Sequence, residues 1–327
     1  MSKKILLIGC GELGSRHLQA VAVCKGIKDI EVVDLNPRAR LLGQKRLKEI
    51  KVNPAICISW SAKLEDATGD GDLCIVATQA EGRGEIIEFA AKKLGYKKFL
   101  VEKIVVSSVR RYKKLLTFAK NNGISAWVNC KSRGYKLFKY IKSRLDPNEP
   151  IVFSVIGGNY GLATNGIHLA DLFVFFDGTQ KILPAGERID PILHPSKRGK
   201  HLFELSGSLY GYTKKGSDFT LSFAKDHRSP DCLSVTSPRR RFWVDYLNNM
   251  AFESDATNGW KWKCIWCEDN ILVSHMTKGF MADILSKNRC DLPTLAECFP
   301  AHEFILSRLQ PHFNRLLKRQ KFFCPVT

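Results

Sequence analysis

The first 130 residues alternate short aliphatic runs with segments whose apolar positions recur at helical spacing. The run from Leu73 to Ala77 is aliphatic throughout except for Cys74, as expected of a strand buried on both faces of a sheet. Between Gly84 and Leu94 the apolar residues lie mainly three or four positions apart, which predicts a helix. We expect strands at 4–8, 30–34, 56–59, 73–77, 99–101 and 126–128, and helices at 14–23, 38–49, 84–94 and 109–119. This alternation predicts a doubly wound parallel sheet.

Beyond about residue 150 the pattern changes to longer strands with fewer helices. The sequence Lys214-Lys215-Gly216 is typical of a hairpin turn between two of these strands. We expect strands at 151–157, 202–212, 218–225, 241–247 and 260–267, and helices at 167–176, 277–288 and 295–318. The chain is therefore predicted to be an α/β protein of two domains. Residues 1–130 hold the parallel sheet, and residues 131–327 form an α+β domain with a mostly antiparallel open sheet.

Composition narrows the class of protein. The 327 residues are 44% hydrophobic and 25% charged, which is usual for a soluble globular protein of about two domains. The longest apolar runs are far shorter than the roughly 20 residues that cross a bilayer. The short run after Met1 is likewise too short for a signal peptide. The eleven cysteines stand mostly among apolar neighbours, so we expect reduced thiols and a cytoplasmic protein.

The charge is unusual, because Lys and Arg exceed Asp and Glu by 19. Such an excess attracts nucleic acid, anionic membranes or acidic small molecules. The basic clusters are short, however, with Arg239–Arg241 among the largest, and no nucleic-acid motif is present. We expect most of them to be solvated surface. Lys131, Arg133 and Arg239–Arg241 are candidate contacts for an acidic substrate.

A glycine motif with the spacing G-x-G-x-x-G lies between the first strand and the first helix. Gly9 permits a tight turn, Gly11 lets the backbone approach a pyrophosphate, and Gly14 lets the helix pack close to the sheet. Asp34 follows at the end of the second strand, where an acidic side chain accepts hydrogen bonds from ribose hydroxyls. We expect the following residues to bind a dinucleotide: Gly9, Gly11, Glu12, Leu13, Gly14, Asp34 and Arg38. An acid here favours NAD, although Arg38 and Arg40 leave NADP open.

Polar residues also stand at the carboxyl ends of the fourth and fifth strands, the edge where open parallel sheets bind ligands. Thr78 follows one strand, and Glu102 and Lys103 follow the other. We expect Thr78 and Glu102 to contact the cofactor. A lysine brought to this edge by a buried strand is a candidate for chemistry, because burial there serves no structural purpose.

A third group opens a helix in the second domain. Asn165, His168 and Asp171 are spaced three apart, so they share one helix face. An isolated histidine on an apolar helix is usually a core residue, and these polar neighbours strengthen the case for a functional one without deciding it. The residues expected to bind substrate are Lys103, Arg133, Asn165, His168 and Asp171.

Taken in chain order, five segments resemble the glucose–fructose oxidoreductase / inositol dehydrogenase / MocA (Gfo/Idh/MocA) family: GCGELG at 9–14, DLCIVAT at 72–78, EK at 102–103, NGIHLADLFVFFDG at 165–178 and LPTLAECFPAHEFIL at 292–306. The resemblance implies a Rossmann domain followed by an α+β domain whose open sheet forms a homodimer or homotetramer. It implies NAD(P)-dependent oxidation or reduction of a sugar, a sugar derivative or a nucleotide sugar.

By the same resemblance, Lys103 matches the lysine of the family's E-K-P motif and His168 the histidine of its D-x-x-x-H motif. These two are the expected catalytic residues: His168 takes the hydroxyl proton while Lys103 binds the same oxygen. Two positions depart from the pattern, since Ile104 replaces the proline and Thr164 the aspartate. Asn165 takes a positioning role instead, as in branches linked to bacterial surface-sugar pathways.

Two other interpretations fit parts of the sequence. The departures at Ile104 and Thr164, with the net charge, leave open a non-catalytic dinucleotide-binding redox sensor on the same fold. Cys264 and Cys267 have the C-x-x-C spacing of a zinc site, but three steps along a strand place their side chains on opposite faces. We therefore expect no metal.

Overall fold

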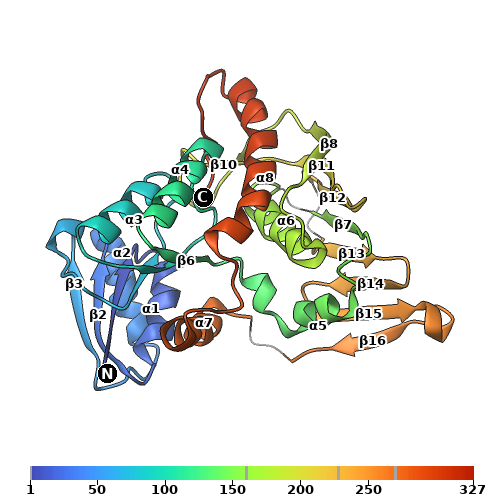
Figure 1. Cartoon of the computed structure of the whole chain (residues 1–327). Coiled ribbons are helices and arrows are strands. Elements are labelled where there is room, and N and C mark those ends of the chain that lie inside the picture. The colour runs from blue at the N-terminus through green and yellow to red at the C-terminus, as the bar shows by residue number, and fades with distance from the viewer. Residues whose placement is uncertain (1, 159–160, 227–228, 269–270) are drawn as a thin grey trace. The chain divides into compact units, whose positions relative to one another are not determined.

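The computed structural model describes residues 2–158, 161–226, 229–268 and 271–327. The chain divides into two compact units, which are described separately (Figure 1). The first consists of Met1–Val106, Arg111–Asn129 and Asn270–Leu295. The second consists of Ser107–Arg110, Cys130–Asp269 and Ala296–Thr327.

The first unit is built on a six-stranded parallel sheet. Its strands are β1 (Lys3–Ile8), β2 (Ile27–Val33), β3 (Cys57–Ser61), β4 (Leu73–Val76), β5 (Lys98–Val101) and β6 (Ser125–Val128), in the order β3-β2-β1-β4-β5-β6. Its helices are α1 (Gly14–Ala22), α2 (Pro37–Leu47), η1 (Leu64–Asp66), α3 (Arg83–Lys92), α4 (Val109–Asn121, here from Arg111) and α7 (Val273–Lys287). The strand order reverses between β1 and β4, so the predicted doubly wound sheet is confirmed, with its ligand-binding edge at the carboxyl ends of these strands.

Helix α7 belongs to this unit, although the sequence assigned everything after residue 130 to the second domain. Phe280 and Ile284 of α7 join Leu18 of α1 in one buried cluster with the sheet. The helix itself was expected, at 277–288. Its apolar face could not reveal which domain it covers, because any buried surface satisfies such a face equally well.

The second unit is built on an eight-stranded sheet. Its strands are β7 (Val152–Gly157), β8 (Leu183–Ile189), β11 (Gly207–Tyr212), β12 (Asp218–Phe223), β13 (Cys232–Thr236), β14 (Arg240–Asp245), β15 (Met250–Asp255) and β16 (Lys263–Trp266), in the order β16-β15-β14-β13-β7-β12-β11-β8. The β7–β12 pair is parallel and the other pairs are antiparallel. The predicted mostly antiparallel sheet is thus confirmed. Strands β9 (His194–Pro195) and β10 (Phe203–Glu204) come between β8 and β11 along the chain and form a separate two-stranded sheet.

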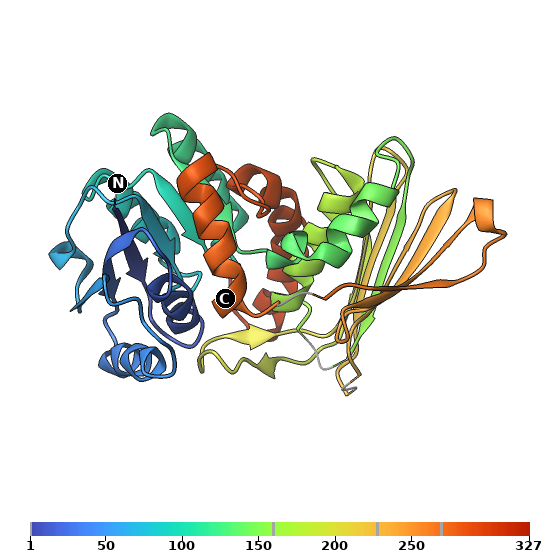
Figure 2. The ribbon, with the colours of Figure 1, turned by 90° about the horizontal axis from the view of Figure 1, so that it is seen from below.

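Helices cover one face of this sheet, which Figure 2 views nearly edge-on. They are α5 (Lys136–Arg144), α6 (Thr164–Asp177) and α8 (Leu295–Leu316); the short turn η2 (Lys131–Gly134) precedes α5, and η3 (Ala256–Asn258) lies in the connection between β15 and β16. Aromatic rings fill the layer between: Phe153, Phe173 and Phe219 lie within 4.8–5.7 Å of one another, centroid to centroid. On the other face Ile156 and Trp266 are 66% and 69% exposed. The sheet is therefore open on that side.

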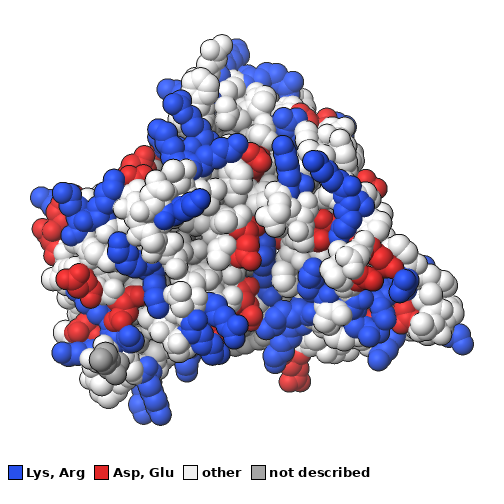
Figure 3. Space-filling view, in the orientation of Figure 1, with Lys and Arg blue, Asp and Glu red and all other residues white. Residues whose placement is uncertain are grey.

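All eleven cysteines are free thiols. Among the described residues, no helix combines the length and apolar character needed to cross a membrane. Lys and Arg side chains are scattered over the face shown in Figure 3, interspersed with acidic and uncharged residues.

Candidate functional site

The glycine motif forms the turn between β1 and α1, at the carboxyl edge of the parallel sheet. Gly9 has φ +87°, and a Cβ there would lie 2.8 Å from the Thr78 nitrogen. A Cβ on Gly14 would lie 1.9 Å from the Gly9 carbonyl oxygen, so the helix packs against the turn as the motif predicts. A Cβ on Gly11 would meet nothing within 4 Å. The backbone at Gly11 is thus open to a ligand.

Helix α1 begins at this turn without a side-chain cap. Its N-cap residue, Leu13, makes no side-chain hydrogen bond to the helix. Uncapped N–H groups and the helix dipole make such a terminus a site for anions, including phosphate groups. The hydroxyl of Thr78 is buried nearby with no hydrogen-bond partner among the described residues. These features fit a dinucleotide pyrophosphate.

Asp34 is fixed at the end of β2 by the glycine turn itself. Its Oδ2 accepts the Cys10 N–H at 2.7 Å, and its Oδ1 accepts the Asn36 N–H at 2.8 Å. Both carboxylate oxygens therefore accept hydrogen bonds from backbone N–H groups. Of the two arginines that left NADP open, Arg40 donates to the Asp34 carbonyl, whereas the Arg38 side chain is exposed.

Arg46 of α2 is a further residue at this turn, which the sequence analysis missed. Its guanidinium binds the Glu12 carboxylate and carbonyl and the Ser15 hydroxyl, the last at 2.5 Å. The Glu12 side chain remains 81% exposed. Arg46 thus holds the turn in place from α2. Because Arg46 and Glu12 are 34 positions apart, no local sequence motif could predict their contact.

Glu102 points inward from the end of β5. Its Oε1 accepts hydrogen bonds from Asn129 at 2.5 Å and lies 2.8 Å from His17 Nε2, while His17 Nδ1 lies 2.8 Å from the Thr277 hydroxyl. Burial raises the pKa of Glu102, but the hydrogen bonds and charge of His17 and the bond from Asn129 outweigh it, so the pKa lies below its usual value. Contact between Glu102 and a cofactor stays a prediction, since its carboxylate already has internal partners.

Lys103 follows at the same edge and is 5% exposed. The peptide bond to Ile104 is cis. The structure thus gathers the glycine turn, Asp34, Thr78, Glu102 and Lys103 at the carboxyl ends of the strands of the first unit. The remaining candidates lie in the second unit.

In the second unit, Asn165 and His168 lie in the first two turns of α6. Asn165 is exposed and His168 is half-buried. Thr164 precedes His168 by one helical turn, so both lie on the same face.

An acidic side chain reaches this helix start from a distant strand. Glu204 of β10 accepts the N–H groups of Ala163 and Thr164, each at 3.2 Å, and the Thr164 hydroxyl. A carboxylate at a helix N-terminus is stabilised by the dipole and the free N–H groups. Glu204 therefore places negative charge at Thr164, the position where the sequence lacks an aspartate. Nothing in the local sequence could reveal it, because the two residues are 40 positions apart.

Asp171 and Arg133 bind each other. Arg133 Nε and Nη2 donate to the two carboxylate oxygens at 2.8 and 2.7 Å, and the side chains are only 8% and 1% exposed. Burial raises the pKa of Asp171 even beside this guanidinium. Substrate contact by either residue stays a prediction; the structure gives each a structural partner instead.

The buried cluster around Asp171 also contains two thiols. Cys130 and Cys298 Sγ lie 3.5 Å apart, and one ligand atom from each of Cys130, Asp171 and Cys298 lies within 4.8 Å of the others. Arg133 already occupies both oxygens of the carboxylate. Burial holds the pKa of the Cys298 thiol well above its usual value. We interpret the cluster as a hydrogen-bonded part of the core.

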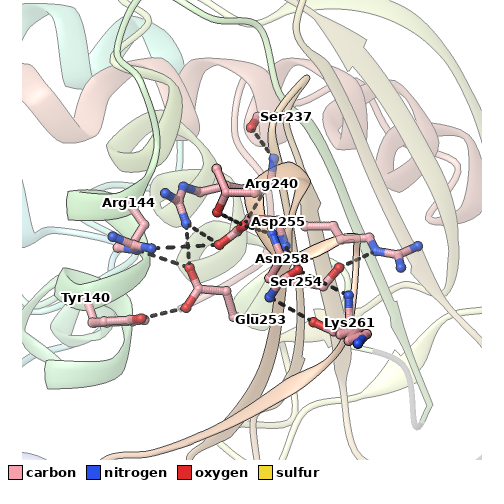
Figure 4. Close-up of polar contacts among 11 residues, drawn as sticks. Tyr140, Arg144, Ser237, Arg240, Glu253, Ser254, Asp255, Asn258 and Lys261 are labelled. Atoms are coloured by element: carbon pink, nitrogen blue, oxygen red, sulfur yellow. Dashed lines mark hydrogen bonds and ion pairs between the residues drawn. The ribbon is translucent and has the colours of Figure 1, made fainter.

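Arg240 and Arg241 contact side chains of their own unit, and Figure 4 shows the partners of Arg240. Arg240 Nη1 lies 2.9 Å from Glu253 Oε1, which Arg144 of α5 also contacts, at 3.1 Å. The Arg241 guanidinium lies 4.5 Å from the centre of the Trp262 ring. These contacts tie α5 and the β14–β15 hairpin together, and a substrate role for Arg239–Arg241 stays a prediction.

Comparison with known proteins bears on the fold. No protein-family model matches the sequence, and no curated protein matches it. Solved structures do match over nearly the whole chain. A Gfo/Idh/MocA family oxidoreductase from Vibrio cholerae gives a TM-score of 0.70 at 13% identity, covering 97% of this chain and 100% of that one. The protein has the Gfo/Idh/MocA fold.

Three further solved structures match over most of the chain, and two of them hold a nicotinamide cofactor. An oxidoreductase from Agrobacterium radiobacter, in complex with NAD+, L-tartaric acid and magnesium, gives a TM-score of 0.73 at 14% identity, covering 93% of this chain and 94% of that one. UDP-N-acetylglucosamine 3-dehydrogenase from Acidithiobacillus ferrooxidans gives 0.68 at 13%, covering 98% and 97%. A 3-ketoreductase mutant from Actinomadura kijaniata, in complex with TDP-benzene and NADP, gives 0.69 at 13%, covering 93% and 96%.

Proposed function

We propose that the protein is an NAD(P)-dependent oxidoreductase that transfers a hydride between nicotinamide and a carbinol or carbonyl carbon of a sugar, a sugar derivative or a nucleotide sugar. The observation that carries the proposal is the glycine turn. Gly14 packs against Gly9, and the backbone at Gly11 is open to a ligand. The turn leads into the N-terminus of α1, which has no side-chain cap. Solved structures of this fold with NAD+ and NADP support it.

The cofactor proposed is NAD. Asp34 would accept hydrogen bonds from the ribose hydroxyls and would repel a 2′-phosphate. Arg38 is the exposed basic residue nearby that would favour NADP. Titration of the purified protein with NADH and NADPH, read by nicotinamide fluorescence, decides between them. Tighter binding of NADPH, unaffected by Arg38→Ala, would contradict the role given to Asp34.

The bound cofactor would supply hydride transfer at a carbinol carbon. In the oxidation direction His168 takes the hydroxyl proton, and Lys103 donates a hydrogen bond to the same oxygen and stabilises its developing negative charge. The exposed Asn165 contacts the substrate one turn away. Glu204 supplies negative charge at the start of α6, one helical turn before His168.

A sugar substrate is supported by two neighbours of the same fold: the UDP-N-acetylglucosamine 3-dehydrogenase and the 3-ketoreductase complex with TDP-benzene. A place in bacterial surface-polysaccharide sugar synthesis would suit such a substrate. The test is stopped-flow mixing of the NAD-bound protein with a panel of nucleotide sugars and sugar acids. A substrate-dependent absorbance change at the nicotinamide band is the expected result.

Variants then test the two catalytic residues. Lys103→Ala and His168→Ala should each lower turnover by about 10²-fold or more, with NADH binding near normal. The exposed residues Lys97 and His201 provide matched controls, and their alanine variants should keep wild-type turnover. Unchanged turnover in Lys103→Ala or His168→Ala would remove that residue from the mechanism.

The second candidate is a non-catalytic dinucleotide-binding sensor, favoured by Thr164 and Ile104 at the two departures from the family motifs. Glu204 weakens this reading, because it restores a carboxylate beside Thr164. Tight NADH binding without turnover across the substrate panel would favour the sensor.

The open sheet face is proposed as the surface of a homodimer or homotetramer. Ile156, Trp243 and Trp266 are 55–69% exposed there, and apolar exposure of this kind marks protein interfaces. Light scattering with size-exclusion chromatography should give a mass of two or four chains, and Trp243→Arg should lower it. A wild-type mass of one chain would contradict this assembly.

A further inference from the structure

Arg83 is the first residue of α3, and its side chain is 1% exposed. Its guanidinium donates to main-chain carbonyls at the ends of two neighbouring strands. Nη2 binds the carbonyl of Thr78, after β4. Nη1 binds the carbonyls of Glu102, at 2.5 Å, and of Ile104, after β5.

These contacts bracket Lys103, because the guanidinium holds the carbonyl on each side of it. The preceding residue is anchored a second time, by its side chain, since the Glu102 carboxylate is bound to His17 and Asn129. The Glu102 N–H also donates to the Val76 carbonyl at 3.0 Å. The chain on both sides of Lys103 is therefore held by bonds from α3, α1, β4 and the residue after β6.

A buried guanidinium is costly unless its N–H groups and its charge are met. Backbone carbonyls accept hydrogen bonds from Nη1 and Nη2 here, and the Glu102 carboxylate supplies opposite charge, since Arg83 contributes to lowering the pKa of Glu102 against the effect of burial. Arginine alone can make this set of bonds. Its planar fork presents five N–H donors, whereas a lysine presents one ammonium group.

We propose that Arg83 is a positioning residue that fixes the backbone on both sides of Lys103 and so sets the direction of its ammonium group. The catalytic meaning of this inference rests on the proposed function of Lys103. The clamp itself rests only on the contacts of the first unit. Displacing a reacting group by about 1 Å can lower a rate by about 10²-fold, so loss of the clamp should lower kcat while NADH binding persists.

The experiment compares Arg83→Ala and Arg83→Lys with Lys92→Ala, which removes an exposed cation from the same helix. Hydrogen exchange of the peptide spanning 99–106 is followed by mass spectrometry, with thermal melting as a check on folding. We expect faster exchange in both Arg83 variants and wild-type exchange in Lys92→Ala. Unchanged exchange in a folded Arg83 variant overturns the clamp, and Arg83→Lys serves if Arg83→Ala does not fold.

Turnover supplies the second readout. We expect kcat to fall by about 10- to 100-fold in Arg83→Ala, with NADH affinity within about threefold, and millimolar guanidinium to restore part of it by filling the vacated space. Guanidinium should not restore Lys103→Ala. Wild-type kcat in an Arg83 variant with faster exchange overturns the positioning role. No turnover in the wild-type protein would instead overturn the proposed function, and exchange alone would then decide the clamp.

Discussion

The ion pair between Arg133 and Asp171 should be among the most sensitive points of the second unit. Both oxygens of Asp171 accept hydrogen bonds from one guanidinium, at 2.7 and 2.8 Å, and neither side chain is more than 8% exposed. Asp171→Ala leaves that guanidinium buried without its countercharge. Breaking a buried pair in this way costs about 3–5 kcal/mol, a large part of the roughly 5–15 kcal/mol by which a domain is stable.

Urea unfolding, followed by far-ultraviolet circular dichroism, measures this loss. Replacing both residues of the ion pair should lower the free energy of unfolding less than removing one of them, because apolar residues of similar volume often restore stability. We therefore expect the double variant Arg133→Met with Asp171→Leu to be more stable than Asp171→Ala. Arg188→Ala, which removes a side chain 75% exposed, is the matched control and should change the free energy of unfolding by less than about 0.5 kcal/mol.

A loss below about 1 kcal/mol in Asp171→Ala, as for an exposed pair, would refute this reasoning. The same variants decide the role of Arg133. If the pair is structural, the folded double variant keeps a KM near that of the wild type for an acidic sugar substrate. If Arg133 binds substrate, KM rises although stability is restored.

Three further predictions concern the two sites. Gly14→Ala should abolish NADH binding, because the added Cβ would lie 1.9 Å from the Gly9 carbonyl oxygen; fluorescence titration checks this, and wild-type affinity would contradict it. Glu204→Gln should cost about 1 kcal/mol in urea unfolding, since it removes a charge from a helix N-terminus, and an unchanged midpoint would show that the charge is irrelevant. The hydrogen bonds and charge of His17 hold the pKa of Glu102 below its ordinary value against the effect of burial, so its ionised form contributes stability above the ordinary pKa of a glutamate and the contribution is lost as the pH falls below it; Glu102→Gln should flatten the acidic loss of unfolding free energy, whereas a decline parallel to that of the wild type would contradict it.

The sequence predicted those features whose causes are local. The turn at Gly9 to Gly14 needs only its own glycines and the flanking elements, and Asp34 follows from their spacing. The alternation of short apolar runs with amphipathic segments likewise predicted the parallel sheet of the first unit. The change to longer strands with fewer helices predicted the mostly antiparallel sheet of the second unit. Helix α5 (Lys136–Arg144) was missed, although Leu137, Phe138 and Ile141 have helical spacing.

What the sequence could not predict are partners brought together by the fold. Arg83 carries no motif, and its role appears only when the ends of β4 and β5 lie side by side. Glu204 reaches α6 from a strand pair too short to leave a pattern. Arg133 was predicted to bind an acidic substrate, and the fold gives it Asp171 as an internal partner that the sequence did not indicate. A charged residue in a sequence does not reveal whether its partner is a ligand or another part of the chain.

The most direct test of the account is binding of NADH to the purified protein, compared between wild type and Gly14→Ala, followed by mixing of the NAD-bound wild type with nucleotide sugars. The account predicts tight binding that Gly14→Ala abolishes, and a substrate-dependent change at the nicotinamide band that Lys103→Ala and His168→Ala suppress. Absence of NADH and NADPH binding by the folded wild-type protein would contradict the assignment of the glycine turn, and with it the proposed oxidoreductase.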